Sequence, residues 1–355
     1  MNQRTIFILS VIFGALVLGL GVQALFRAYD RTTAGSGRDG SVLAVSFDPA
    51  KVEKILIGRP VQPAGRAAVA PVELVKDGAA WKVKNLWNAK ADPAKIKTLL
   101  QKIGALRGEF RGSGKDLFPD FGITDTEAFS LKFEAASDVS VLDLRIGTKP
   151  AGNGYFVRKA GGNDVYFAEI DLAGLFGIFT PFEDAIPAGD FWADVTLFDL
   201  APEKVRKITV NHIRGTEKQM TAGCALEKDP KDPAQTTWVF LQRADRSFAL
   251  DPDKVLRFIA TLNSVKAQKV VDPAGKDYGL EKPAWEIAVT EGERETVLSL
   301  GAKDEKTSSY FVKISAVPAI FQLSAYYAED LQIDDSRFMK EAPKENPPVA
   351  APAKL

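Results

Sequence analysis

The sequence contains very little of the two side chains that most often bind metals or form covalent intermediates. Its 355 residues include one cysteine, Cys224, and one histidine, His212. A lone cysteine cannot form an internal disulfide, and one histidine with one cysteine nearly excludes a zinc site of the usual ligand types. A histidine-dependent triad would have to use His212, yet no G-x-S-x-G nucleophile elbow accompanies it. We therefore expect no catalytic, cofactor-binding or metal-binding residues, no cofactor, and a buried, apolar role for Cys224.

An excess of charge of either sign is also missing. Lysine and arginine total 46, and so do aspartate and glutamate. This balance provides no global field for a polyanion, so we expect no nucleic-acid partner. Gly112–Asp116 resembles a phosphate-binding loop, but Glu109 stands where the first glycine is needed and Asp116 where Ser or Thr is needed. Phosphate binding at that loop is therefore not expected.

One long stretch without charge is present near the N-terminus. Thr5 to Phe26 comprises 22 uncharged residues, long enough to span a hydrocarbon core of about 30 Å. We interpret 1–27 as an uncleaved membrane anchor in contact with the lipid bilayer and the glycine-rich 28–42 as a flexible tether. The alternatives are a cleaved signal peptide, whose apolar region is usually only about 7–15 residues, and a buried core helix. The short N-terminal tail favours an N-in, C-out orientation.

Within this stretch two pairs of small residues have the spacing that lets membrane helices approach closely. They are Ser10 with Gly14, and Ala15 with Gly19. Small residues are common in membrane helices, which is the simpler explanation. The functional alternative is that these four residues pack against the membrane helices of a partner.

The rest of the chain repeats itself over the length of a domain. Offsets between equivalent landmarks range from 151 residues (Phe47 to Phe198) to 159 (Asp92 to Asp251). The other landmark pairs are Trp81/Trp238, Gly122/Gly279, Gly147/Gly301 and Tyr155/Tyr310. We predict two tandem domains, 43–190 and 191–340, followed by a disordered tail over 341–355 that is rich in proline and alanine.

Each copy contains one amphipathic helix that begins after an Asp-Pro pair, at Asp92-Pro93 and at Asp251-Pro252. Aspartate is a good N-cap, and proline suits the first helical position. The apolar residues follow the same spacing of i, i+3, i+4, i+7 and i+10, which predicts one buried stripe: Ile96, Leu99, Leu100, Ile103 and Leu106, then Val255, Phe258, Ile259, Leu262 and Val265.

Strands surround this helix in both copies. Asp77-Gly78 predicts a two-residue hairpin turn, and Gly122 and Gly279 predict turns with positive φ. Short helical segments are expected to close the copies at Leu172–Ile178 and Val317–Leu323. Because strands run consecutively around one main helix, the predicted fold is α+β, with two tandem copies of a mostly antiparallel sheet packed on one main helix and an N-terminal transmembrane helix in front.

The order of these landmarks resembles the domain of unknown function 4340 family. The first series includes Trp81, Phe121-Gly122-Ile123 and Tyr155-Phe156-Val157, and the second includes Trp238, Tyr278-Gly279-Leu280 and Tyr310-Phe311-Val312. The resemblance implies a bacterial inner-membrane protein with a single membrane pass and most of its chain in the periplasm. It also implies an association with ABC-type transport systems, and it supplies no catalytic residues.

We accordingly expect a non-enzymatic accessory or scaffold protein that partners ABC-type permease or ATPase components. The alternatives are a periplasmic module that binds envelope glycan or lipid, and an envelope hydrolase that uses paired carboxylates. Specificity is expected where the copies differ or meet: the Asp229–Gln235 insertion, a loop over Gly108–Asp116, and the connector Pro181–Asp194.

Overall fold

The computed structural model describes residues 42–59, 70–178, 187–229, 232, 234–242 and 249–341. The predicted anchor lies outside these ranges, together with Ser10, Gly14, Ala15 and Gly19, nearly all of the tether, and the tail beyond residue 341. None of the helices formed by the described residues is both long enough and apolar enough to span a bilayer.

The described strands form two sheets, and every strand pair whose register is given is antiparallel. The ten-stranded sheet contains β1 (Val42–Ala44), β2 (Lys54–Gly58), β3 (Val72–Asp77), β4 (Ala80–Val83), β5 (Ala89–Lys90), β6 (Arg107–Ser113), β7 (Phe129–Glu134), β8 (Ser140–Ala151), β9 (Gly154–Lys159) and β10 (Asp164–Ala168). The eight-stranded sheet contains β11 (Val205–Arg214), β12 (Glu217–Lys228), β13 (Thr236–Phe240), β14 (Lys269–Val271), β15 (Trp285–Glu291), β16 (Arg294–Asp304), β17 (Ser309–Ile314) and β18 (Ile320–Ser324).

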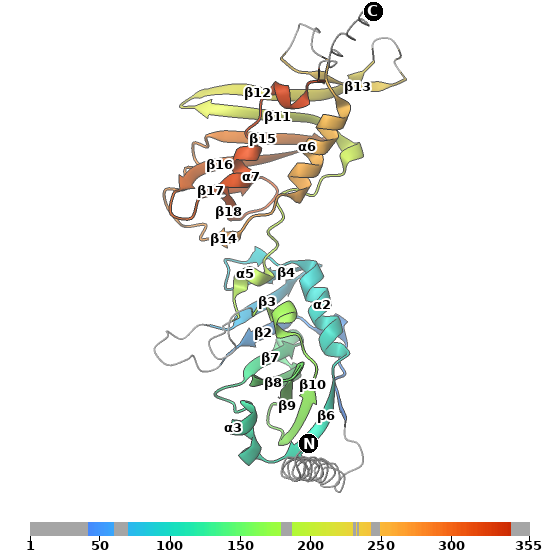
Figure 1. Ribbon diagram of the computed structural model, residues 1–355, viewed down its shortest axis with the longest axis vertical. Helices are drawn as coiled ribbons and strands as arrows, with labels where there is room; N and C mark the ends of the chain where they lie inside the picture. Colours follow the sequence, from blue (N-terminus) through green and yellow to red (C-terminus); the bar gives the residue numbers. More distant parts are fainter. Residues whose placement is uncertain are drawn as a thin grey trace, which may run out of the picture. The chain divides into compact units, whose positions relative to one another are not determined.

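The strand order confirms the duplication that the landmarks predict. The first sheet runs β1-β6-β10-β9-β8-β7-β2-β3-β4-β5, and the second, counted from β14, runs β14-β18-β17-β16-β15-β11-β12-β13. With β1 and β5 left out, the strands of the two sheets correspond one to one in the same order: β6 to β14, β10 to β18, β9 to β17, β8 to β16, β7 to β15, β2 to β11, β3 to β12 and β4 to β13. Figure 1 shows the two sheets, each with one longer helix beside it. The predicted α+β class with tandem, largely antiparallel sheets is therefore confirmed.

The two main helices, α2 (Pro93–Gly104) and α6 (Pro252–Ser264), begin where the Asp-Pro pairs predict. Asp92 Oδ1 accepts from the N–H of Ala94 at 2.9 Å, and Asp251 Oδ1 accepts from the N–H of Asp253 at 3.0 Å. All ten residues of the two predicted apolar stripes are buried. Such a stripe stabilises a helix mainly through packing, because short isolated helices are marginal in water. The shorter helices are α3 (Phe118–Phe121), α4 (Leu172–Phe176), α5 (Gly189–Trp192) and α7 (Ala325–Asp330).

The paired glycines lock the same turn against the same bulge in both copies. Gly122 and Gly279 have φ values of 62° and 66°, as predicted. Each turn lies against a register shift, in β8 after Ile146 and in β16 after Leu300. A Cβ on Gly147 would stand 2.5 Å from the Phe121 oxygen, and one on Gly301 would stand 2.1 Å from the Tyr278 oxygen. Only glycine permits this close approach of two backbone segments.

The predicted hairpin turn at Asp77-Gly78 and the predicted helix that closes the first copy are confirmed, but the predicted helix that closes the second copy is wrong. Asp77 pairs with Ala80 around Gly78, and α4 lies within the predicted Leu172–Ile178 segment. Val317–Leu323 is not a helix: Ile320–Ser324 forms β18, which pairs with β17 and β14, and helix α7 follows it. A short apolar run is equally consistent with a strand buried on both sides, and here the sheet pairing decides.

The glycine-rich Gly108–Asp116 segment is not a loop either. Its first part belongs to β6, which lies between β1 and β10. A Cβ on Gly108 would come within 2.9 Å of the Tyr166 Cβ and 3.2 Å of the Leu43 Cβ. The glycine therefore permits tight packing within a strand, a role that its composition alone does not distinguish from a turn.

The chain divides into two compact units. One contains the described residues of 1–72 and 97–187, and the other contains those of 73–96 and 188–355. In the second unit, segment 73–96 is joined to the residues around α5 by backbone bonds: the Asp92 N–H donates to Trp192 O at 2.8 Å, and the Asp194 N–H donates to Lys90 O at 2.8 Å. Trp192 is fully buried at this junction.

Candidate functional site

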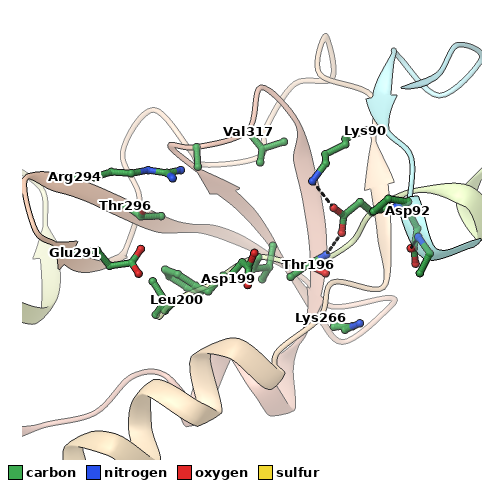
Figure 2. A pocket seen from close by; sticks show the side chains of 16 residues that line it. Lys90, Asp92, Thr196, Asp199, Leu200, Lys266, Glu291, Arg294, Thr296 and Val317 are labelled. Atoms are coloured by element: carbon green, nitrogen blue, oxygen red, sulfur yellow. Dashed lines mark hydrogen bonds and ion pairs between the residues drawn. The ribbon is translucent and has the colours of Figure 1, made fainter. Parts of the chain in front are cut away.

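The second unit contains a polar pocket of about 640 Å³. Its lining comes from segment 90–94, from 194–200, from Lys266, from the β15–β16 hairpin, and from the turn after β17. Figure 2 shows Lys90 and Asp92 at one end and Glu291, Arg294 and Thr296 at the other. A volume of this size falls within the range of about 300–1,000 Å³ that is usual for small-molecule sites.

The carboxylates at the first end are already engaged. Asp92 caps α2, and its Oδ2 lies 3.7 Å from the Lys95 Nζ. Asp194 Oδ2 accepts from the Lys90 Nζ at 2.9 Å, and its Oδ1 accepts from the Thr196 N–H at 3.1 Å (Figure 2). Burial alone would raise the pKa of Asp194, but the bonds from Lys90 and Thr196 outweigh it and hold the pKa below its ordinary value.

The middle of the pocket is formed by a segment that side chains hold in place. The Asn263 side chain makes a reciprocal pair with the Leu200 backbone, donating to its oxygen and accepting from its N–H, both at 2.8 Å. The Ala201 N–H donates to Glu291 Oε1, also at 2.8 Å. Leu197, Phe198 and Leu200 are buried. The backbone of 197–201 is thereby fixed by groups on α6 and β15, which gives the pocket a preformed wall.

Three charged side chains of the lining remain available to a ligand. Lys266, Arg294 and Asp199 are exposed, and within the described part of the chain none of them makes a side-chain hydrogen bond or ion pair. Thr296 is 6% exposed and lines the pocket next to Arg294. Free cations beside a fixed wall suit the binding of a polar or anionic group. A general acid would need a raised pKa, the opposite of what holds for Asp194.

The residues considered in the sequence for chemistry lie away from this pocket. His212, on β11, stacks on Trp285 with ring centroids 4.4 Å apart. Cys224 is fully buried, as predicted, and burial raises the pKa of its thiol to about 12. Such a thiol is almost never ionised at neutral pH and is a poor nucleophile. Among the described residues, no three His, Cys, Asp or Glu side chains gather where they could hold a metal ion.

The three segments in which the sequence predicts specificity can be compared with the pocket lining. Among the described residues of the three segments named for specificity, only Asp194, at the end of the connector, lines this pocket. The other lining residues were not singled out from the sequence, but a comparison of equivalent positions in the two copies could have found some of them. Strand register pairs Leu142 with Phe133 and Thr296 with Val289, so a buried leucine of the first copy stands where the second copy has a threonine. Counting from the caps, Gly104 corresponds to Asn263, which does not line the pocket but holds Leu200 of its wall.

The fold is that of a duplicated α+β protein, and the polar pocket lies in its second unit. The family model of a domain of unknown function (DUF4340) matches residues 81–238 and again 238–351. The chain belongs to this family, in two tandem copies. The matches begin at Trp81 and Trp238, the equivalent tryptophans. Neither the comparison with curated proteins nor the comparison with solved structures finds a match.

Proposed function

We propose that the protein is a non-enzymatic accessory protein of the bacterial envelope, anchored in the inner membrane by its N-terminal segment, with the two copies in the periplasm and an ABC-type transport system as its partner. The uncharged stretch from Thr5 to Phe26 supports the anchor. The transport partner rests on the family resemblance, and the accessory role rests on the pocket.

One observation carries the accessory role. The copies agree in their packing residues and differ at the pocket, where the second copy has Thr296 and Asn263 in place of Leu142 and Gly104. Three of the four carboxylates of this pocket hold the fold together: one caps α2, one pairs with Lys90 and one fixes the Ala201 N–H, while Asp199 is exposed. The exposed cations Lys266 and Arg294 remain to recognise another molecule. This pattern is typical of a binding surface on an inherited scaffold.

The experiment is capture of the partner in intact membranes. A photo-crosslinking amino acid at Arg294 is expected to trap a permease or ATPase subunit, while the same amino acid at Glu305, an exposed residue outside the pocket lining, is expected to trap far less. Recovery of no transport component from Arg294 would contradict the proposal. Equal trapping at both positions would also contradict it, because contact would then not be specific to the pocket.

A second candidate function is the binding of an envelope glycan or lipid head group in the same pocket. The volume and the free polar side chains favour it. The lining offers no exposed aromatic ring for stacking on a sugar, because Phe198 is buried and Trp81, Tyr155, Trp238 and Tyr310 lie outside the lining. Binding of purified envelope glycans that is weakened by Arg294→Ala would favour this candidate over a protein partner.

A further inference from the structure

A second pocket, of about 500 Å³, lies in the second unit beside one face of α6. Its lining comes from residues 254–261 of α6 and from the 3-10 helix η6 (Asp335–Phe338). Lys254, Arg257 and Arg337 are its charged residues, with Thr261 and Ser336 as its polar residues and Phe258 as its apolar one. Every charged side chain of the lining is therefore a cation.

The cations of this pocket are only weakly neutralised. Arg257 is exposed, and its guanidinium has no ion pair with any described residue. The Lys254 Nζ lies 3.8 Å from Glu341, whose side chain is 82% exposed, and the Arg337 guanidinium lies 3.3 Å from Asp330. The Asp334 carboxylate accepts from Ser336, and the Asp335 carboxylate accepts from the Gly223 N–H. Exposed pairs of this kind contribute about 0–1 kcal/mol, so an anion can compete with them.

In the first copy, the position equivalent to this pocket is occupied by a contact between a lysine and a phenylalanine. Lys95 and Lys254 both stand three residues after the capping aspartate. The Asp92 N–H donates to Trp192 O, and the Asp251 N–H donates to Phe338 O, which makes Phe191 the counterpart of Arg337. In the first copy the Lys95 Nζ donates to Phe191 O at 2.5 Å and lies 4.6 Å from the centre of its ring. With arginine in place of phenylalanine, that cation–π contact cannot form, and two like charges face the pocket instead.

We propose that this pocket binds a phosphate group, carried by a small molecule or by a lipid head group. Guanidinium groups bind phosphate oxygens in a bidentate manner, and Arg257 and Arg337 supply two of them beside the Lys254 ammonium. A phosphate monoester carries a charge of about −1.5 to −2 at neutral pH, which several cations together can neutralise. The lining is confined to one helix face and one short turn. Its surface is much smaller than the roughly 800 Å² that each partner of a protein complex usually buries, which favours a small ligand over a protein.

The test compares matched charge reversals on the full chain in an uncharged detergent. Inorganic phosphate and glycerol 3-phosphate are titrated calorimetrically at constant ionic strength, because exposed charges are screened by salt. The parent protein is expected to bind at least one of them at least ten-fold more tightly than the double variant Arg257→Glu/Arg337→Glu. The control is Lys102→Glu, since Lys102 is the exposed counterpart of Thr261 on α2; it is expected to leave binding unchanged. Unchanged unfolding midpoints would show that the variants still fold.

A lipid source is distinguished in a second arm. The full chain is placed in phosphatidylcholine nanodiscs with or without phosphatidylglycerol, and amide exchange is followed over residues 253–261. Added protection that needs phosphatidylglycerol and is lost in the double variant assigns a lipid head group, whereas binding of the free phosphates without this effect assigns a soluble ligand. The proposal is overturned if every probe binds parent and double variant equally, or if only an acidic peptide such as polyglutamate is bound.

Discussion

The first and second copies have the same strand order, the same capped helix and the same glycine turn, but they differ in how they place charge. In the first copy Arg158 is 1% exposed, donates to the Ile123 oxygen and to Asp125, both at 2.7 Å, and lies over the Phe118 ring. The register equivalent in the second copy is Lys313, which is exposed. The cation that the first copy uses internally at this position is thus solvent-facing in the second.

The largest expected effect tests the shared part of this comparison. In Gly301→Ala the new Cβ would stand 2.1 Å from a backbone oxygen, and in Gly147→Ala it would stand 2.5 Å from one. We expect each to lower the free energy of unfolding by about 4 kcal/mol, because neither backbone can move away cheaply. Urea unfolding with amide exchange to locate the loss measures it. Gly292→Ala is the control, with φ of 56° and no atom within 4 Å, and should cost about 1 kcal/mol. A large loss in only one copy would break the equivalence.

The next effect tests the divergence at Arg158. Arg158→Met is expected to destabilise the protein by about 3 kcal/mol, since the buried Ile123 carbonyl would lose its donor. Lys313→Met is expected to change the stability by no more than about 0.5 kcal/mol, as is usual for exposed positions. Urea unfolding of both variants measures this. Similar losses for the two would show that the cations have the same role in both copies.

A smaller effect is expected from exchanging the residues at one position of the β8 and β16 strands. Leu142→Thr places a hydroxyl in the core of the first copy and should cost about 2 kcal/mol. Thr296→Leu should change stability by less than about 0.5 kcal/mol and should reduce crosslinking at Arg294, because the residue lines the pocket. Denaturation and crosslinking yield measure the two outcomes. A strongly destabilising Thr296→Leu would instead mean that the threonine supports the fold.

The smallest effect concerns two neighbouring aspartates whose pKa values move in opposite directions. Burial raises the pKa of Asp190, with a smaller opposing effect from Lys269, whereas the bonds to Asp194 lower its pKa in spite of burial. The unfolded value is about 3.9. Asp194 therefore stabilises the fold above that pH, and its contribution is lost as pH falls through its lower folded pKa. Asp190 costs stability once ionised, and this cost disappears as pH falls through its raised folded pKa.

Asparagine substitutions separate these two aspartates. At pH 7 Asp194→Asn should be less stable than the parent and Asp190→Asn more stable, and both differences should shrink on acidification. The difference for Asp190→Asn should shrink first, because its folded pKa lies above about 3.9 and that of Asp194 lies below it. Urea unfolding at a series of pH values from neutral to acidic measures both. Differences of the same sign for the two variants would contradict the assignment.

From the sequence alone, the capped helices, their buried stripes and the glycine turns could be predicted, because each depends on residues close together in the chain. The repeat could be predicted because its landmarks recur in the same order. The apolar run Val317–Leu323 wrongly predicts a helix, because so short a run has no period of its own. Gly108 wrongly predicts a loop, because a glycine can serve either a turn or a tight contact within a strand. In both cases strand pairing from distant residues decided.

The two pockets likewise could not be predicted from the sequence, because their lining residues are distant in the chain and are brought together only by the tertiary structure. Arg294 and Lys266 come together with the 194–200 segment only because β16, α6 and that segment converge, and Arg337 meets Arg257 only because η6 returns to the start of α6. Local propensities and periodicities act over a few neighbouring residues, so they can be recognised in the sequence. The position of one charge opposite another that is distant in the chain depends on the packing of whole elements, and only the folded structure places it.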